Sequence, residues 1–162
     1  MGQSLGTAVA VGLAADPEVR KTSPNVEGAL LISPFLSVPK AATSAFPFVP
    51  LAALELLVKD PFDSEAKAAA LVAAPAPPAP VTTFAGQAPA PFRWLVMHGT
   101  EDEIVPFGHG KQLAATLKAA GGHDVVFKAL NGAGHNNIFS RDWGMKVFGL
   151  IERFAFATTA SA

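Results

Sequence analysis

The sequence predicts an α/β domain, or part of one, in which a mostly parallel sheet of about three strands is flanked by helices. Three short apolar runs have the length and residue types of buried strands, and segments with helical spacing separate them. Half of the 162 residues are hydrophobic and only 15% are charged, which is typical of strands buried on both faces. Strands that alternate with helices pair in parallel through right-handed crossovers.

The first half of the chain predicts one helix and one strand. A run of small residues over 6–15 contains no helix breaker before Pro17, which favours a tightly packed helix. Residues 27–33 (EGALLIS) form a short apolar run that ends before Pro34, which is typical of a buried strand.

Residues 34–91 are expected to form a cap or insertion within a single partial domain over 1–162. Large apolar side chains are scattered there among prolines, and Ser64 is placed to cap a helix over 65–73. Residues 75–91 are rich in proline and alanine and too poor in large apolar side chains to pack. We expect them to form an irregular surface loop.

The second half predicts two strands and two helices. The strands are expected at 92–97 (FRWLVM) and 124–130 (DVVFKAL), which are rich in aromatic and branched residues. A helix over 108–120 is expected between them, with Gly121 and the following glycine as its stop. A final amphipathic helix is marked by apolar residues at helical spacing: Trp143, Val147, Leu150, Ile151 and Phe154.

Composition excludes several kinds of function. A net charge of −1 offers no surface that neutralises phosphates, so nucleic acid binding is not expected. The absence of cysteine excludes disulfides, thiolate zinc sites and a thiol nucleophile. No stretch of roughly 18 apolar residues predicts a transmembrane segment, and the start of the chain does not resemble a signal peptide. Localisation stays open between soluble and membrane-peripheral, since a targeting signal would lie upstream of Met1.

A Gly-x-Ser-x-Gly pentapeptide stands at the start of the chain, with Ser4 between Gly2 and Gly6. Such a serine is a nucleophile when it lies on a sharp turn between a strand and a helix, where the glycines remove colliding side chains. The N–H of Leu5 would then face a developing oxyanion. We expect the strand leading into this turn to be missing. The alternative is that Ser4 is a mobile terminal residue.

An acidic cluster follows the predicted strand at 92–97. The segment 95–106 (LVMHGTEDEIVP) places Glu101, Asp102 and Glu103 after a buried strand, at the carboxyl edge of the sheet where α/β active sites lie. The alternative is a solvated acidic loop.

One of the four histidines is placed to act as a general base. His135 follows the last predicted strand in a Gly-Ala-Gly-His loop, whose small residues let an imidazole reach the sheet edge. His98 is expected to bond a loop carbonyl in a structural role. His109 and His123 are interpreted as surface residues.

These three motifs, in the order serine, acid, histidine, resemble the C-terminal portion of α/β-hydrolase-fold serine hydrolases. Within that fold the chain is most similar to the lipid-esterase and protein-depalmitoylase branch, from Gly2 to about Phe154 apart from 75–91. The resemblance implies a partial α/β-hydrolase fold whose N-terminal strands are missing. It also implies Ser4 as nucleophile, Asp102 as the acid (from the pattern His-Gly-x-x-Asp-x-x-Val-Pro) and His135 as base, with no metal or organic cofactor.

The function implied is hydrolysis of carboxylic esters or thioesters, with an acyl-lipid or S-acyl substrate. Apolar residues at the family's cap position either bind an acyl chain or pack the cap: Phe35, Phe46, Phe48, Leu51, Leu54 and Phe62. A serine peptidase resembling prolyl aminopeptidases is the second enzymatic alternative. An inactive truncated hydrolase that associates through an open sheet edge is the third. With one of two oxyanion donors missing, we expect weak turnover from the isolated chain.

Overall fold

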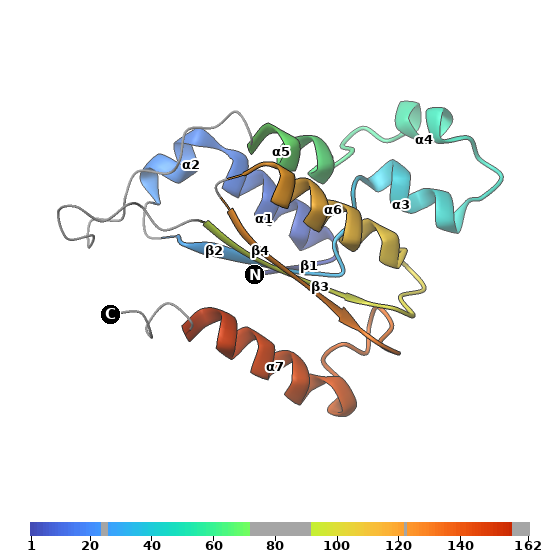
Figure 1. The fold of residues 1–162 in the computed structure, drawn as a ribbon. Helices are drawn as coiled ribbons and strands as arrows, with labels where there is room; N and C mark the ends of the chain where they lie inside the picture. Colours follow the sequence, from blue (N-terminus) through green and yellow to red (C-terminus); the bar gives the residue numbers. More distant parts are fainter. Residues whose placement is uncertain (24–25, 72–91, 122, 157–162) are drawn as a thin grey trace.

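The protein forms one parallel sheet with helices on both faces (Figure 1). In the computed structural model, residues 1–23, 26–71, 92–121 and 123–156 are described. The strand order is β1-β2-β3-β4, and every neighbouring pair is parallel. The strands are β1 (Gly2–Gln3), β2 (Gly28–Ile32), β3 (Phe92–Gly99) and β4 (His123–Leu130). The predicted α/β class and the parallel pairing are confirmed.

The sheet contains a short strand that the sequence analysis did not predict. Gly2 and Gln3 pair with Leu31 and Ile32 of β2, and the N–H of Ser4 donates to the carbonyl of Ile32 at 2.9 Å. The strand leading into Ser4 is therefore present for its last two residues. Pairing with β2 satisfies backbone groups that would otherwise be buried without partners, which explains why so short a segment is extended.

Alternation along the strands directs apolar side chains to two separate cores. Leu31, Trp94 and Val96 point to a helical layer formed by α1 (Leu5–Ala15), α2 (Pro17–Thr22), α5 (Ser64–Ala70) and α6 (Phe107–Ala119). Leu30, Ile32, Leu95 and Met97 face α7 (Arg141–Phe156), which covers the other face (Figure 1). This double coverage explains why the strands read as continuous apolar runs.

Two helix starts differ from the prediction. Pro17 ends α1 as expected, but it also begins α2, because the Asp16 carboxylate accepts hydrogen bonds from the N–H groups of Glu18 and Val19. Asp63, rather than Ser64, caps α5 by accepting from the N–H of Ala66 at 2.8 Å. The C-terminal stop of α6 is as predicted.

The predicted insertion over 34–91 contains α3 (Val38–Ala45), α4 (Leu51–Leu57) and α5. Helix α5 packs against α1 and α6, and Lys40 of α3 forms an ion pair with Glu65 at 2.5 Å. Helix α5 is therefore continuous with the helical layer over the sheet. The proline- and alanine-rich segment 75–91 lies outside the described residues, and the boundary of the insertion stays a prediction.

Packing of α6 on the sheet predicts a large stability effect at Leu113. Its side chain is 0% exposed, so we expect Leu113→Ala to lower the free energy of unfolding by about 2–5 kcal/mol through lost burial and a residual cavity. Leu56→Ala, at a side chain that is 87% exposed, serves as the matched control and should change it by less than about 0.5 kcal/mol. Urea unfolding followed by circular dichroism measures both. Equal effects at the two positions would contradict this packing.

Candidate active site

The three predicted catalytic residues follow the carboxyl ends of strands in the same sheet. Ser4 follows β1, Asp102 follows β3 and His135 follows β4. Because all strands are parallel, these ends lie at one edge, where the loops of α/β proteins form their sites.

The turn at Ser4 has the strained geometry expected of a nucleophile elbow. Ser4 has φ 49° and ψ −118°, which is unusual for a residue with a side chain. Its carbonyl accepts from the N–H and the hydroxyl of Thr7 at 2.9 and 2.5 Å. A Cβ atom at Gly2 would overlap the carbonyl of Gly6, so the turn requires glycine there.

The Ser4 side chain and the Leu5 amide remain available for chemistry. The hydroxyl of Ser4 does not cap α1, although Ser4 is its N-cap residue. Leu5 is the first residue of α1, so its N–H has no acceptor within the helix. The positive end of the helix dipole lies at the same point.

Asp102 and His135 are joined by a buried hydrogen bond. Nδ1 of His135 lies 2.8 Å from Oδ2 and 3.0 Å from Oδ1 of Asp102. The side chain of Asp102 is 0% exposed and that of His135 is 6% exposed. Oδ1 also accepts from the N–H groups of Ile104 and Val105, at 3.0 and 2.7 Å. Among the three clustered carboxylates, Asp102 is therefore the one that contacts the imidazole.

Glu103 holds the histidine loop. Its Oε2 accepts the N–H of His135 at 3.2 Å. A Cβ atom at Gly134 would lie 2.7 Å from this oxygen, so the small residue before His135 lets the two loops approach. The N–H of Glu101 donates to the carbonyl of Ala133 at 3.0 Å and adds a second link.

Hydrogen bonds keep Asp102 ionised. Burial raises the pKa of a carboxyl group, but donors from Val105, His135 and Ile104 outweigh burial and hold the pKa of Asp102 below its ordinary 3.8. The hydroxyl of Ser33, at the carboxyl end of β2, adds to this effect. The Ser33 hydroxyl makes no hydrogen bond of good geometry within the described residues, but it lies close enough to Asp102 to favour the ionised form of that carboxyl group.

Ser4 and His135 are linked indirectly. Nε2 of Gln3 donates to the carbonyl of His135 at 3.5 Å, which connects the serine turn to the histidine loop. No hydrogen bond joins the Ser4 hydroxyl to the imidazole within the part of the chain that is described. Such contacts are often long in unliganded enzymes and tighten when substrate binds.

His98 has more contacts than sequence reasoning found. Its Nε2 lies 2.9 Å from the carbonyl of Val105, which is the expected loop contact, and 3.3 Å from Oδ2 of Asp102, which was missed. Ser33 was also missed. Ser33 is fully buried and has φ 49°. The sequence shows only a serine after an apolar run, which predicts neither the burial nor the backbone conformation. His109, interpreted as a surface residue, is partly buried, and its Nδ1 accepts from the N–H of Leu36 at 3.5 Å.

The residues predicted to bind an acyl chain do not share one environment. Phe35 is 4% exposed and packs with Ala8 and Val105, and Phe62 packs against the same cluster. Phe46 and Phe48, by contrast, are 57% and 96% exposed, and Leu51 is partly buried at the start of α4. Phe35 and Phe62 thus serve the core.

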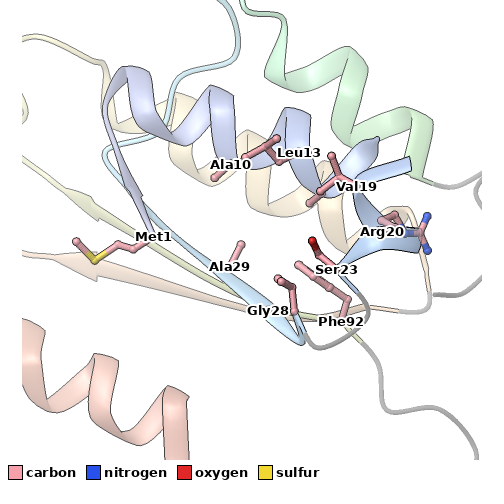
Figure 2. Close-up of a pocket in the computed structure, with 11 residues that line it drawn as sticks. Met1, Ala10, Leu13, Val19, Arg20, Ser23, Gly28, Ala29 and Phe92 are labelled. Atoms are coloured by element: carbon pink, nitrogen blue, oxygen red, sulfur yellow. The ribbon is translucent and has the colours of Figure 1, made fainter. Parts of the chain in front are cut away.

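A cavity of about 300 Å³ lies away from these residues (Figure 2). Leu13 of α1, Val19 of α2, Gly28 of β2 and Phe92 of β3 line it. Gly28 and Phe92 are the first residues of their strands. The cavity therefore opens at the amino ends of the strands, opposite to Asp102 and His135.

Two features are absent from the described ranges of the chain. None of their helices is long and apolar enough to cross a membrane. Within the same ranges, no three histidine, aspartate or glutamate side chains are grouped so that they could hold a metal ion.

Fold and sequence together define the class of this protein, the α/β-hydrolase fold. The sequence profile of the prolyl oligopeptidase family matches residues 72–160, which is more than half of the chain. The chain belongs to this family. The predicted resemblance to α/β-hydrolases is confirmed, whereas the finer assignment to the lipid-esterase and depalmitoylase branch stays a prediction. No curated protein matches the chain in sequence.

Two solved structures with TM-scores above 0.5 share the fold at low sequence identity. Pyrococcus horikoshii acylaminoacyl peptidase superposes with a TM-score of 0.61 at 13% identity, over 94% of this chain and 22% of its own. The candidate non-heme bromoperoxidase BpoC from Mycobacterium tuberculosis H37Rv gives 0.55 at 14% identity, over 99% of this chain and 66% of its own. Zea mays acyl-protein thioesterase 2 gives 0.39 at 18% identity, over 78% and 39%. The chain thus spans about a fifth of the length of the acylaminoacyl peptidase.

The lowered pKa values of His98 and His109 predict that stability falls as the pH falls. Burial lowers the pKa of both His98 and His109 below the ordinary 6.5, so the unfolded chain takes up protons that the folded chain does not. We therefore expect the free energy of unfolding, measured in urea, to decrease between about pH 7.5 and pH 5.5. His109→Gln should reduce this slope, because one of the two groups is then removed. A free energy of unfolding that stays constant over this range would contradict the assignment.

Proposed function

We propose that this chain supplies the catalytic triad of a serine hydrolase, with Ser4 as nucleophile, His135 as general base and Asp102 as its partner. The observation that carries the proposal is the buried hydrogen bond between Asp102 and Nδ1 of His135. It leaves Nε2 as the ring nitrogen that can accept a proton from the serine. The strained turn at Ser4, on the same edge of the sheet, supports the role of the nucleophile.

The proposed reaction proceeds through an acyl-enzyme. The Ser4 hydroxyl attacks the substrate carbonyl while Nε2 of His135 takes its proton, and Asp102 stabilises the imidazolium. The Leu5 N–H donates to the oxyanion of the tetrahedral intermediate. Collapse expels the leaving group, which receives the proton from His135. Water, deprotonated by the same imidazole, then releases the acyl group and regenerates Ser4.

Family membership favours a peptide bond as the substrate. The matching family is that of prolyl oligopeptidase, and an acylaminoacyl peptidase shares the fold. We therefore put forward cleavage of short peptides as the first candidate. Hydrolysis of acyl esters or thioesters is the second, because Phe46 and Phe48 leave apolar surface exposed between α3 and α4. A catalytically inactive chain is the third alternative.

Covalent labelling tests the triad directly. We expect a fluorophosphonate probe to modify Ser4 of the 162-residue chain slowly, because one of two oxyanion donors is missing, and Ser4→Ala to abolish the adduct that peptide mass spectrometry locates. Asp102→Asn should slow labelling by about 10⁴-fold, because the imidazole loses its orientation and its counter-charge. Ser44→Ala removes an exposed hydroxyl from α3 and should change nothing. Labelling that survives in Ser4→Ala would refute the assignment, and a wild-type chain that resists the probe would favour the inactive alternative.

Substrate profiling separates the two substrate classes. We expect N-acylated peptide p-nitroanilides to be hydrolysed, and p-nitrophenyl acetate and octanoate to react at similar kcat/KM, within about threefold. A strong preference for octanoate would favour the lipid substrate instead. In that case Phe48→Ala should reduce the octanoate rate alone, since this side chain is exposed and has no role in the core.

A further inference from the structure

We propose that His98 is a positioning residue that holds the Asp102 carboxylate in place for His135. This role rests on the proposed function and goes beyond the triad. His98 lies near the end of β3, four residues before Asp102, and its side chain is completely buried.

The contacts of His98 fix its tautomer. Nε2 faces two acceptors, the carbonyl of Val105 at 2.9 Å and Oδ2 of Asp102 at 3.3 Å, so this nitrogen must carry a proton. Nδ1 has no hydrogen-bond partner among the described residues. A proton on Nδ1 would therefore be a buried donor without an acceptor, which is costly. His98 is neutral and donates only through Nε2.

A neutral donor suits a position next to a catalytic carboxylate. A cation at His98 would compete with His135 for the negative charge of Asp102. Burial lowers the pKa of His98, which keeps the ring uncharged, although Asp102 and the Val105 carbonyl act in the opposite sense. His98 can thus orient the carboxylate while leaving its charge to His135.

The two oxygens of Asp102 are held by different groups. Oδ1 accepts the N–H groups of Ile104 and Val105. Oδ2 accepts the N–H at Nδ1 of His135 at 2.8 Å, and Nε2 of His98 lies 3.3 Å from the same oxygen. The ring of His98 also bonds the carbonyl of Val105, so it fixes the same turn whose amides hold Oδ1. Ser33 is the remaining polar side chain beside the carboxylate.

Helix α6 packs closely against the ring of His98. A Cβ atom at Gly110 would overlap Nδ1 and lie 3.0 Å from Cβ and Cγ of His98. A side chain at Gly110 would push the ring away from its position. Helix α6 therefore contributes to the geometry of Asp102 without contacting it through a polar group.

Two substitutions of His98 test the proposal. His98→Leu removes the donor, whereas His98→Gln keeps an N–H at the same distance along the side chain. We expect His98→Leu to raise the pKa of Asp102 by about one unit, as followed by the ¹³C shift of its carboxyl carbon, because the charged form loses a donor. Labelling of Ser4 by fluorophosphonate should slow about tenfold. His98→Gln should restore both values.

A purely structural His98 predicts a different result. His98→Leu would then lower the stability but leave the pKa of Asp102 unchanged, and that outcome would overturn the proposal. The carboxyl titration does not depend on activity. If the wild-type chain is not labelled at Ser4, the proposed function fails while the titration still decides the role of His98.

A pair of glycine variants keeps the test valid if His98→Leu does not fold. Gly110→Ala displaces the ring without changing its chemistry, whereas Gly108→Ala in the same helix meets nothing within 4 Å. We expect Gly110→Ala to raise the pKa of Asp102 and to slow labelling, and Gly108→Ala to leave both unchanged. Identical Asp102 titrations in Gly110→Ala and wild type would count against the proposal.

Discussion

The buried hydrogen bond between Asp102 and His135 is the interaction on which the site depends. A carboxylate with no exposed surface is stable only when donors replace the water it has lost, and Asp102 obtains them from two backbone amides and the imidazole of His135, while Nε2 of His98 lies 3.3 Å from Oδ2. Two of these donors, Ile104 and Val105, belong to its own loop. The third, His135, comes from the loop after β4, so folding of the neighbouring strand is required before the charge is fully compensated.

Parallel pairing is what brings these donors together. β3 and β4 are paired along their whole lengths, from Phe92 with His123 to Gly99 with Leu130, so the two loops start side by side. β2 adds Ser33 at the same edge, and β1 adds Ser4 through its pairing with Ile32. Each strand therefore delivers at least one polar side chain to the edge. The apolar clusters on both faces of the sheet fix the strands, and through them the distances within the site.

Local patterns were sufficient to predict most of the sheet, but contacts between distant segments were not predictable from them. The strands β2, β3 and β4 follow from their apolar runs, and the loop contact of His98 follows from its place at a strand end. Whether Asp63 or Ser64 caps α5 depends on backbone geometry at a single residue, which composition does not encode. The burial of Phe35 and Phe62 depends on α1 packing over them, so their apolar character alone suggested a substrate pocket. The place of Ser33 beside Asp102 depends on the pairing of β2 with β3, which the sequence of either strand alone does not indicate.

The two histidines at Asp102 differ in the surroundings of their second nitrogen, and this difference separates their proposed roles. Nδ1 of His98 faces the backbone of α6 at Gly110, where no acceptor could stabilise an added proton. His135 uses Nδ1 for the carboxylate, and its Nε2 makes no hydrogen bond within the described residues, so that nitrogen can gain and lose a proton. A general base needs such an exchangeable position, whereas an orienting group must keep one fixed protonation state. The same residue type beside the same carboxylate can therefore perform two functions, because α6 packs against Nδ1 of His98, whereas Nε2 of His135 makes no hydrogen bond within the described residues.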